Sequence, residues 1–337
     1  MDALFNNGYV QLYHADARQL PIPDESIDCV VTSPPYWGLR DYGLGGWVGG
    51  DEDCEHRGIV LGNNRNFVDR EGRGSNNPSL SSGTCQKCGA IKASDGIGLE
   101  ATPEDFCANM VEVFREAWRV LKPTGTVWLN LGDSYGDKQL LGIPWRVAFA
   151  LQADGWYLRS DIIWSKTNPM PESVSDRPTK AHEYIFLLTK SPRYYYDADA
   201  IKEPMSAASM IRNQSGWNGN QERDYAGGTQ NHLSKYLGSD NAKEATHRNK
   251  RSVWEITTQP YAEAHFATYP EKLVEPCILA GCPLNGVVLD PFVGSGTTLS
   301  VAQRLGRRGV GTDLNLEYLT LASKRLSAVS LPMNLGI

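Results

Sequence analysis

The fold is decided by the stretch Ile27-Asp28-Cys29-Val30-Val31-Thr32-Ser33-Pro34-Pro35-Tyr36-Trp37. Its first half is a short, apolar, β-branched run, which is typical of a buried parallel strand. Prolines fix φ and lack the N–H group that a sheet ladder needs, so we expect the strand to stop at Ser33. The last polar groups of the strand then point out of the carboxyl edge of the sheet, where open α/β folds bind ligands. Taken alone, the stretch fits equally well a strand terminator followed by a surface aromatic.

A second strand end, far along the chain, carries a glycine-rich turn: Val287-Val288-Leu289-Asp290-Pro291-Phe292-Val293-Gly294-Ser295-Gly296-Thr297-Thr298. An apolar strand meets an acidic residue and then the turn, and the apolar face of a helix follows from Thr297. Such a turn lets a ligand approach the backbone, and the helix N-terminus offers free N–H groups. The stretch lacks the Gly-Lys-Ser/Thr of a phosphate loop and the third glycine of a dinucleotide fingerprint. The missing glycine disfavours a nucleotide-dependent oxidoreductase on the same fold.

Together the two stretches resemble the motifs of the DNA amino-methyltransferases, which move a methyl group from S-adenosylmethionine to an exocyclic amine of adenine or cytosine. The resemblance implies that the glycine-rich turn holds the cofactor through Asp290, Phe292, Gly294, Ser295, Gly296 and Thr297. It implies that the target base is held by Ser33, Pro34, Pro35 and Tyr36. The catalytic motif precedes the cofactor motif, as in the permuted β group of the family.

Further segments are matched to the family's cofactor site. Asp313 lies 23 residues after Asp290, close to the separation at which an acidic strand end reaches a ribose hydroxyl, and by resemblance it binds the ribose of the cofactor. The segment 265–272 resembles, more loosely, the motif that contacts the methionine moiety, through Thr268 and Pro270.

Asp16 follows an expected strand at 10–14. If the sheet follows the family, this strand lies between the strands that bear Asp313 and Ser33, and Asp16 then reaches the adenine of the cofactor. A helix N-cap is an equally good interpretation of Asp16 from the sequence alone.

Alternating strands and helices indicate the fold class. Helices are expected at 102–121, 143–154, 297–305 and 317–326, and strands at 126–131, 157–164, 183–189 and 309–312. This alternation predicts an α/β fold with a doubly wound, mostly parallel, Rossmann-like sheet, to which a zinc-binding insertion and a target-recognition region are added. We assign 1–37 and 99–196 to the catalytic part of the methyltransferase domain and 260–337 to its cofactor-binding part.

The segment 38–98 is rich in Gly, Asn, Arg and Asp and is too long for an ordinary loop. Such a segment needs an anchor, and its four candidate metal ligands are Cys54, His56, Cys85 and Cys88. Two close pairs separated by a long loop supply the ligand number of a structural zinc site. The Cys-x-His spacing is tighter than usual, and free buried thiols are the alternative. We predict one structural Zn²⁺ in this insertion.

The segment 197–259 is rich in Asn, Gln, Ser and Gly, with scattered aromatic residues. Between 205 and 254 it holds seven Lys and Arg against four acidic residues, whereas the whole chain has a net charge of −6. A local basic excess suits contact with phosphates, although an acidic protein is a weak candidate for nucleic-acid binding. We predict a target-recognition region that orders on DNA, with a disordered linker as the alternative.

The composition is that of a soluble globular protein, with 41% hydrophobic and 21% charged residues. There is no run of about 18 apolar residues, and the first ten residues lack the pattern of a signal peptide. We expect a cytoplasmic protein of a bacterium, an archaeon or a phage, a monomer or homodimer without a membrane partner. The expected partner is double-stranded DNA, with a cognate restriction endonuclease as a candidate partner whose presence the sequence does not give.

The chemistry follows from what an aromatic amine requires. Its lone pair is delocalised into the ring, so acceptors such as the Ser33 hydroxyl and the Pro34 carbonyl must localise that pair toward the methyl group. The amine is buried in the duplex, so the base must be flipped out, and Tyr36 can then stack on it. Family members with Ser at this position usually act on cytosine N4, and those with Asp or Asn usually act on adenine N6. We therefore predict a cytosine-N4-specific enzyme, with adenine N6 as the runner-up and a non-catalytic, zinc-containing DNA-binding module as the alternative of another class.

Overall fold

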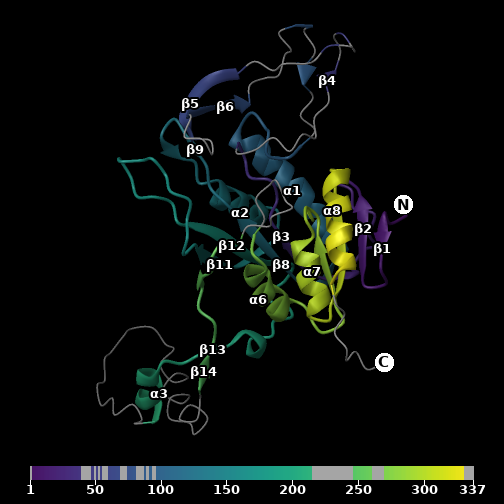
Figure 1. Ribbon diagram of the computed structural model, residues 1–337. Coiled ribbons are helices and arrows are strands. Elements are labelled where there is room, and N and C mark those ends of the chain that lie inside the picture. Colours follow the sequence, from purple (N-terminus) through teal and green to yellow (C-terminus); the bar gives the residue numbers. More distant parts are fainter. Residues whose placement is uncertain are drawn as a thin grey trace. The chain divides into compact units, whose positions relative to one another are not determined.

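The computed structural model describes residues 2–38, 47–48, 51, 54, 60–68, 74–80, 87–88, 91–92, 96–214, 246–259 and 269–329 (Figure 1). The chain forms two compact units. The first comprises Met1–Tyr196 with Ser252–Ile337, and the second comprises Asp197–Arg251. In the described parts of the chain, no helix is long and apolar enough to cross a membrane.

A nine-stranded sheet organises the first unit, in the order β1-β2-β17-β16-β3-β8-β12-β11-β15. Its strands are β1 (Phe5–Asn6), β2 (Val10–His14), β3 (Ile27–Thr32), β8 (Leu121–Leu131), β11 (Tyr157–Ser165), β12 (His182–Thr189), β15 (Val253–Glu255), β16 (Val287–Asp290) and β17 (Arg308–Asp313). The five strands from β2 to β8 are parallel, and β12 runs antiparallel to both of its neighbours. The carboxyl ends of β2, β17, β16, β3, β8 and β11 and the amino end of β12 therefore share one edge of the sheet.

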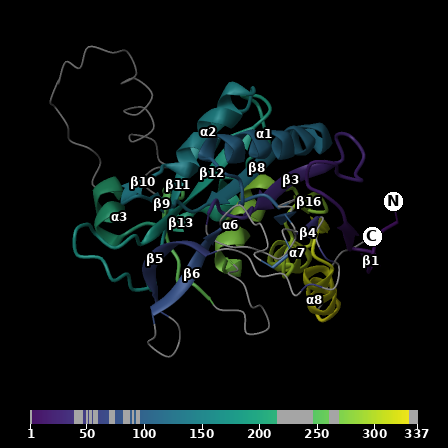
Figure 2. The ribbon, with the colours of Figure 1, turned by 90° about the horizontal axis from the view of Figure 1, so that it is seen from above.

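Helices cover both faces of this sheet. Figure 2 shows α1 and α2 on one face and α6, α7 and α8 on the other. Their bounds are α1 (Pro103–Val120), α2 (Ile143–Ala153), α6 (Glu271–Gly281), α7 (Thr297–Arg304) and α8 (Leu316–Ser327). Thr102 caps α1 by accepting a hydrogen bond from Asp105 N, and Asn315 caps α8 in the same way from Glu317 N. A mostly parallel sheet with helices on both faces confirms the α/β, doubly wound prediction.

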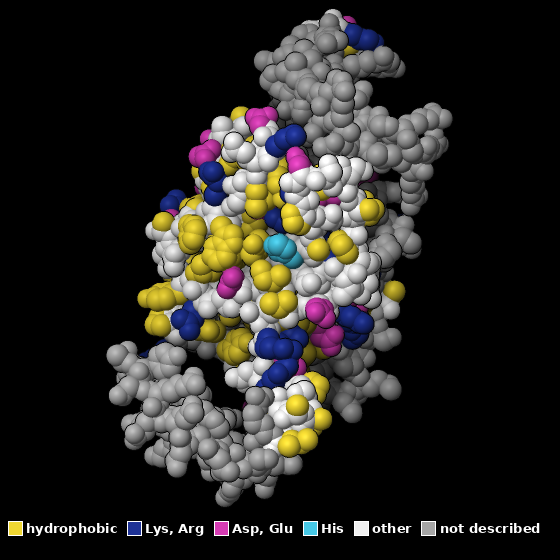
Figure 3. Space-filling view, turned by 90° about the vertical axis from the view of Figure 1, so that its left-hand side faces the viewer, with side chains coloured by type: hydrophobic (Ala, Val, Ile, Leu, Met, Phe, Trp, Pro, Cys, Tyr) yellow, Lys and Arg dark blue, Asp and Glu magenta, His cyan; other side chains and the backbone are white. Residues whose placement is uncertain are grey.

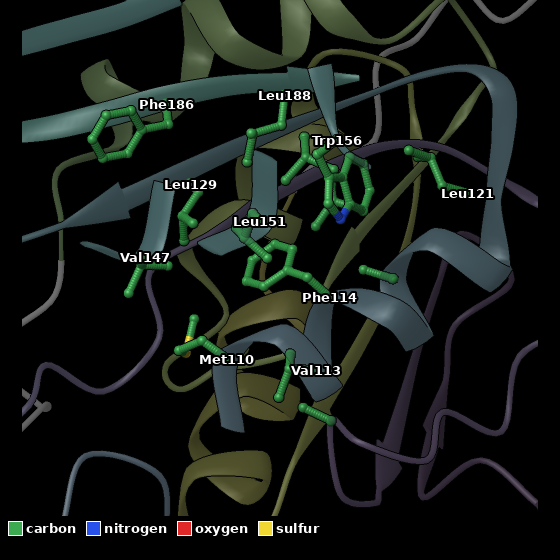
Figure 4. Close-up of a cluster of buried hydrophobic side chains, with 14 of the residues drawn as sticks. Met110, Val113, Phe114, Leu121, Leu129, Val147, Leu151, Trp156, Phe186 and Leu188 are labelled. Carbon is green, nitrogen blue, oxygen red and sulfur yellow. The ribbon is translucent and has the colours of Figure 1, made fainter. Parts of the chain in front are cut away.

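The larger hydrophobic core lies between the sheet and the helices α1 and α2. Figure 4 shows Phe114 and Met110 of α1 among side chains from α2 and from the strands β8 and β12. Trp156 packs against α1, with its ring edge-on to Phe114 at 6.4 Å and to Trp118 at 4.8 Å between centroids. This packing fixes the end of β8, on which part of the site is built.

The predicted place of the strand at 10–14 was wrong. This strand, β2, pairs with β17 on the side away from β3, and β16 lies between β17 and β3. The reason is burial, because a central strand must be apolar on both faces and β16 is, whereas β2 leaves His14 exposed. The expected helices and strands otherwise lie within a few residues of those observed.

The remaining short strands form two-stranded ribbons. Within the first unit, β4 (Trp47–Val48) pairs with β7 (Ile91–Lys92), β5 (Val60–Val68) with β6 (Gly74–Leu80), and β9 (Tyr135–Gly136) with β10 (Gln139–Leu140). The second unit holds a 3₁₀ turn (Asp199–Ile201), α3 (Ala207–Gln214) and the ribbon of β13 (Glu203–Pro204) with β14 (His247–Arg248). Of the segment 197–259, the last part belongs to the first unit, because β15 pairs with β11. The target-recognition role of this segment stays a prediction.

Candidate active site

Five chain segments that are distant in sequence meet at the carboxyl edge of the sheet. Ser33 follows β3, Asp290 ends β16, and Asp313 ends β17. Asn130 lies near the end of β8, and Glu183 lies at the start of the antiparallel β12. Strand order therefore divides the edge into a side at β16 and β17 and a side at β3, β8 and β12, which we call the turn side and the Ser33 side.

Side-chain hydrogen bonds connect the residues of the Ser33 side. Ser33 Oγ donates to Tyr36 Oη at 3.3 Å, and Tyr36 Oη donates to Glu183 Oε2 at 2.6 Å. The Asn130 amide donates to Tyr36 Oη at 2.6 Å, to Glu183 Oε2 at 3.1 Å and to Ser33 Oγ at 3.2 Å. Ser33 Oγ thus donates its one hydrogen to Tyr36 and accepts from Asn130 with one of its two lone pairs, so the other lone pair can accept from a further donor.

A lysine completes this network. Lys166 Nζ pairs with Glu183 Oε1, the carboxylate oxygen that Tyr36 does not use. Both side chains of the pair are largely buried, at 22% and 14% exposure. The Lys166 ammonium also lies 4.7 Å from the centre of the Trp164 ring. A carboxylate in this setting has both oxygens engaged and is held in one orientation.

Two glycines make room for the Ser-Pro-Pro-Tyr turn. A Cβ on Gly132, which follows β8, would lie 2.5 Å from Cε2 of the Tyr36 ring. A Cβ on Gly98 would lie 3.2 Å from Pro35 Cβ, and the φ of Gly98 is +100°, in the left-handed region that favours glycine. The Trp37 indole is also fixed, because its Nε1 donates to Glu100 O at 3.0 Å. The short distance at Gly132 shows that the Cε2 edge of the Tyr36 ring lies against the backbone of Gly132.

On the turn side, Asp290 is buried, and its carboxylate collects four donors. Its partners are Thr298 Oγ1 at 2.6 Å, Thr32 Oγ1 at 2.7 Å, Tyr269 Oη at 3.1 Å and Phe292 N at 3.1 Å. Burial raises the pKa of Asp290, although these hydrogen bonds oppose the rise. With 1% exposure, Asp290 is enclosed by these donors at the base of the turn, and its predicted role in holding the cofactor stays a prediction.

The glycine-rich turn adopts the backbone that its sequence favours. Gly294 and Gly296 have φ values of +48° and +78°, and Gly296 is the N-cap of α7. Ser295 and Thr297 are buried, and Arg325 of α8 donates to Thr297 Oγ1 at 2.9 Å. Phe292 is half-buried against the larger core. The turn is therefore braced by a neighbouring helix before any ligand arrives.

Asp313 differs from Asp290 in its donors. Its carboxylate accepts Asn315 N at 2.9 Å and Gly294 N at 3.0 Å, so it holds both the start of the loop before α8 and the glycine-rich turn. Burial raises the pKa of Asp313 to about 6, and the nearby Asp290 adds to the rise against these hydrogen bonds. The hydrogen bonds to this carboxylate come from backbone N–H groups, and acceptor capacity remains on its oxygens.

Three further predicted cofactor residues lie outside the turn itself: Asp16, Thr268 and Pro270. Asp16 follows β2, and Ala15 N donates to Asp313 O at 3.3 Å, which places Asp16 at the same edge. Burial raises the pKa of Asp16, but its hydrogen bonds with Arg18 outweigh this effect and lower the pKa. Asp16 begins a turn rather than a helix, so the N-cap interpretation was wrong. Pro270 is buried at the N-cap of α6, and Thr268 lies outside the described residues.

The predicted zinc ligands are divided by what the structure describes. Cys54 and Cys88 are described and half-buried, whereas His56 and Cys85 lie outside the described residues. Among the residues that are described, no three His, Cys, Asp or Glu side chains are grouped so as to hold a metal ion. The four-ligand zinc site stays a prediction.

Sequence reasoning did not single out Asn130, Glu183, Lys166, Tyr269 or Thr32. The available signal was position, since Asn130 and Glu183 are polar residues at the ends of apolar strands that the same reasoning placed correctly. Thr32 was quoted as part of the strand, but its hydrogen bond to Asp290 links the two sides of the site across β3 and β16.

Charge on one face of the molecule is mixed. Figure 3 shows Lys and Arg side chains interspersed with Asp and Glu on one face, beside a broad group of hydrophobic side chains. Among the described residues on this face, basic side chains do not form one continuous patch.

Comparison with known proteins matches this arrangement. The family model described as DNA methylase covers residues 27–324. The Type II methyltransferase M.SmaI of Serratia marcescens is 37% identical over 342 residues, which span 92% of this chain and 88% of that protein. The Type II methyltransferase M.Cfr9I of Citrobacter freundii is 38% identical over 346 residues, which span 94% of this chain and 87% of that protein. The chain belongs to the DNA methylase family of amino-methyltransferases and is a DNA methyltransferase.

Solved structures share the fold. PvuII DNA methyltransferase, named as cytosine-N4-specific, superposes with a TM-score of 0.59 at 16% identity, over 98% of this chain and 89% of that one. TTHA0409 from Thermus thermophilus, in complex with S-adenosyl-L-methionine, superposes with a TM-score of 0.51 at 20% identity, over 96% and 95%. At these identities the likeness concerns the fold.

Proposed function

We propose that this DNA methyltransferase transfers a methyl group from S-adenosyl-L-methionine to the exocyclic N4 of a cytosine flipped out of double-stranded DNA. The observation that carries this proposal is the state of Ser33, whose hydroxyl donates to Tyr36, accepts from Asn130 and keeps an acceptor site at the strand end. The hydrogen bond from Thr32 to Asp290 fixes this strand end against the glycine-rich turn.

The residues of the turn side fit the cofactor. Left-handed Gly294 and Gly296 let a ligand approach the backbone, and the start of α7 follows directly. Asp313 supplies a carboxylate with remaining acceptor capacity, which suits the ribose hydroxyls, while Asp16 at the next strand end suits the adenine. Bound S-adenosyl-L-methionine supplies an electrophilic methyl group. The TTHA0409 complex with this cofactor, on the same fold, supports the assignment.

The Ser33 side supplies what the amine requires. Ser33 Oγ and the Pro34 carbonyl accept the two amine hydrogens, which localises the nitrogen lone pair on the side that faces the cofactor. Pro35 keeps the backbone extended, and the Tyr36 ring, which rests against Gly132, stacks on the flipped base. The network fixes each of these groups before the base arrives, so little reorganisation is needed at the moment of transfer.

Cytosine N4 is preferred to adenine N6 because of Ser33. A serine hydroxyl is a short acceptor, whereas the aspartate or asparagine that family members acting on adenine usually carry is longer, so the two place the amine at different depths. The cytosine-N4-specific name of the PvuII structural neighbour supports the same choice. The second candidate is N6-adenine methylation, since both amines need the same acceptors.

The predicted partners and the zinc site complete the proposal. The second unit, with basic residues such as Arg248 and Arg251, is proposed to read the target sequence, and a restriction endonuclease with the same target is the proposed cellular partner. The name Type II methyltransferase, borne by the relatives, supports this pairing. Zn²⁺ held by Cys54, His56, Cys85 and Cys88 is proposed to anchor the insertion.

The test is identification of the product. The protein is incubated with double-stranded DNA and S-adenosyl-L-methionine that carries a deuterated methyl group, and the DNA is digested to nucleosides for mass spectrometry. We expect the label in N4-methylcytosine, and far less of it in the same incubation time with Ser33→Ala. Label in N6-methyladenine alone would replace the proposal by its runner-up, and unlabelled DNA would contradict both.

A further inference from the structure

Methylation of an amine leaves a proton to be removed. When the amine nitrogen bonds to the methyl carbon, the carbon–sulfur bond breaks and sulfur keeps both electrons. The nitrogen then carries a positive charge and must release one of its two hydrogens as a proton. A base that takes the proton as the bond forms lowers the barrier, and such assistance is typically worth about 10²- to 10⁴-fold in rate.

Ser33 touches the amine in the proposed function but is a poor final acceptor, because a protonated alcohol is a very strong acid. The structure offers a path beyond it. We propose that Glu183 is the terminal proton acceptor and that Ser33 and Tyr36 relay the proton from the amine to it. This inference rests on the proposed function, because it requires an amine at Ser33.

The directions of the hydrogen bonds suit this relay. Ser33 Oγ already donates its hydrogen to Tyr36 Oη, and Tyr36 Oη already donates its own to Glu183 Oε2 at 2.6 Å. As Ser33 takes the amine proton, its original hydrogen passes to Tyr36, and that of Tyr36 passes to Glu183. The transfer ends with a neutral Glu183 and unchanged hydroxyl groups on Ser33 and Tyr36. Solvent restores the carboxylate after the product leaves.

Asn130 holds the three side chains of this path in position. Its amide nitrogen lies within hydrogen-bonding distance of all three members of the relay, which share its two hydrogens, and it accepts from none of them, so it fixes their oxygens without supplying a competing acceptor. The other amide atom, Oδ1, is buried without a hydrogen-bond partner, although leaving such an atom unpaired costs about 1 to 3 kcal/mol. In this orientation the amide satisfies its N–H groups and leaves its oxygen unsatisfied, so the hydrogen bonds of the N–H groups determine where it lies. Asn130 is a positioning residue in this account.

Lys166 settles which oxygen of Glu183 receives the proton. It pairs with Oε1, so Oε2 is the oxygen that faces Tyr36. The pair is largely buried, and Glu183 is thus reached from the amine through Tyr36 rather than through open solvent. A carboxylate at this place has no role in binding the cofactor turn, which lies on the other side of β3.

The experiment compares Glu183→Gln with the unaltered protein in single-turnover methyl transfer from pH 6 to pH 9. Glutamine keeps the size and an acceptor for Tyr36 but cannot take the proton. We expect a rate about 10²-fold lower at neutral pH that recovers as the pH rises, because solvent bases replace the carboxylate, while the Kd for S-adenosyl-L-methionine changes less than about twofold. A loss by one constant factor at every pH indicates a structural role and overturns the relay.

A second variant keeps the proposal testable if Glu183→Gln folds poorly. Tyr36→Phe retains the stacking ring and removes the hydroxyl of the relay, and we expect it to slow transfer by a similar factor. The double variant should then be no slower than the slower single variant, because both changes break one path. Independent, multiplying losses would contradict a shared path.

The matched control is Glu116→Gln. Like Glu183, Glu116 is a partly buried carboxylate paired with a cation, in this case Arg119 at 2.8 Å. Its other partner is Leu20 N, which precedes β3 in the chain and is not part of the proposed relay. The rate of methyl transfer by the Glu116→Gln variant should stay within about twofold of that of the unaltered protein. Full activity in Glu183→Gln overturns the relay alone, whereas an unaltered protein that yields no methylated DNA overturns the proposed function and the relay together.

Discussion

The turn side and the Ser33 side of the site hold their carboxylates in different ways. Asp290 and Asp313 are held mainly by backbone N–H and hydroxyl donors near the glycine-rich turn, and burial raises the pKa of each. Glu183 is held by side chains from three distant segments, Tyr36, Asn130 and Lys166. The first arrangement fixes a shape that a ligand can enter. The second connects groups that can exchange protons.

This contrast separates binding from chemistry, and it can be tested on each side. Changes on the turn side should alter stability and cofactor affinity. Changes on the Ser33 side should alter the rate of transfer with little effect on either.

The largest effect is expected for Asp290→Ala. It leaves the hydroxyls of Thr32, Thr298 and Tyr269 and the N–H of Phe292 without their buried acceptor, so the free energy of unfolding should fall by about 3 kcal/mol or more. Urea denaturation measures this loss. The control Asp154→Ala removes an ion pair with the exposed Arg115 and should cost less than about 1 kcal/mol. Similar losses in both variants would show that Asp290 does not support the turn.

Asp313→Ala should weaken S-adenosyl-L-methionine binding by about 1.5 to 3 kcal/mol, the scale of a hydrogen bond to a charged group. The carboxylate offers its remaining acceptor capacity to the ribose, and it also holds Gly294 N. Calorimetric titration gives the affinity. An unchanged Kd would refute the assignment of Asp313 to the cofactor.

Affinity for the cofactor should also depend on pH through Asp313. Its pKa is raised to about 6, so the carboxylate takes up a proton as the pH falls from 7 to 5, and the Kd should rise about tenfold over this range. The same raised pKa means that Asp313 favours the folded state most below pH 4 and that this contribution is lost as the pH rises through 6. In Asp313→Asn, the Kd should be flat between pH 5 and pH 7. A slope that survives the substitution would assign it to another group.

Gly132→Ala tests the Ser33 side by shape alone. The added Cβ would meet the Tyr36 ring at 2.5 Å, so the ring must move and the hydrogen bonds of its hydroxyl must lengthen. We expect methyl transfer to slow by about tenfold, the equivalent of about 1.4 kcal/mol, while cofactor affinity is kept. Gly155→Ala, where a Cβ meets nothing within 4 Å but φ is +113°, controls for the added methyl group and for backbone strain in general. Equal losses of rate in the two variants would remove Tyr36 from the explanation.

The smallest effect on chemistry is expected from the metal. Purified protein that was never exposed to chelator should contain about one equivalent of zinc, held by Cys54, His56, Cys85 and Cys88. Its removal should lower thermal stability and leave cofactor affinity within about twofold, because a closed structural site supplies folding energy rather than chemistry. Less than about half an equivalent by metal analysis would count against the site.

The same contrast explains how much of the site the sequence predicts. The turn side is contiguous, so Asp290, Gly294 and Gly296 stand together in the chain and their spacing alone indicates a strand, a turn and a helix. The hydrogen bonds that enclose Asp290 could not be predicted in the same way, since two of its donors, Thr32 and Tyr269, lie outside the glycine-rich stretch.

Only part of the Ser33 side can be predicted from the sequence. Ser33 to Tyr36 form a motif, but Asn130 and Glu183 lie about 100 and 150 positions away and meet them only through the order β3-β8-β12. The place of β2 was missed for a related reason, because strand order is set by which strands are apolar on both faces. Sequence spacing predicts elements, whereas the neighbours of a side chain depend on how strands are paired.

The division of labour between the two sides is tested most directly by one variant, Ser33→Ala, measured in two ways on the same sample. Calorimetry gives the Kd for S-adenosyl-L-methionine, and single-turnover transfer to DNA gives the rate. We predict a Kd within about twofold of the unaltered protein and a rate lower by about 10²-fold or more, because Ser33 touches the amine and not the turn. Loss of cofactor affinity in step with the rate, or transfer at nearly the original rate, would contradict the account.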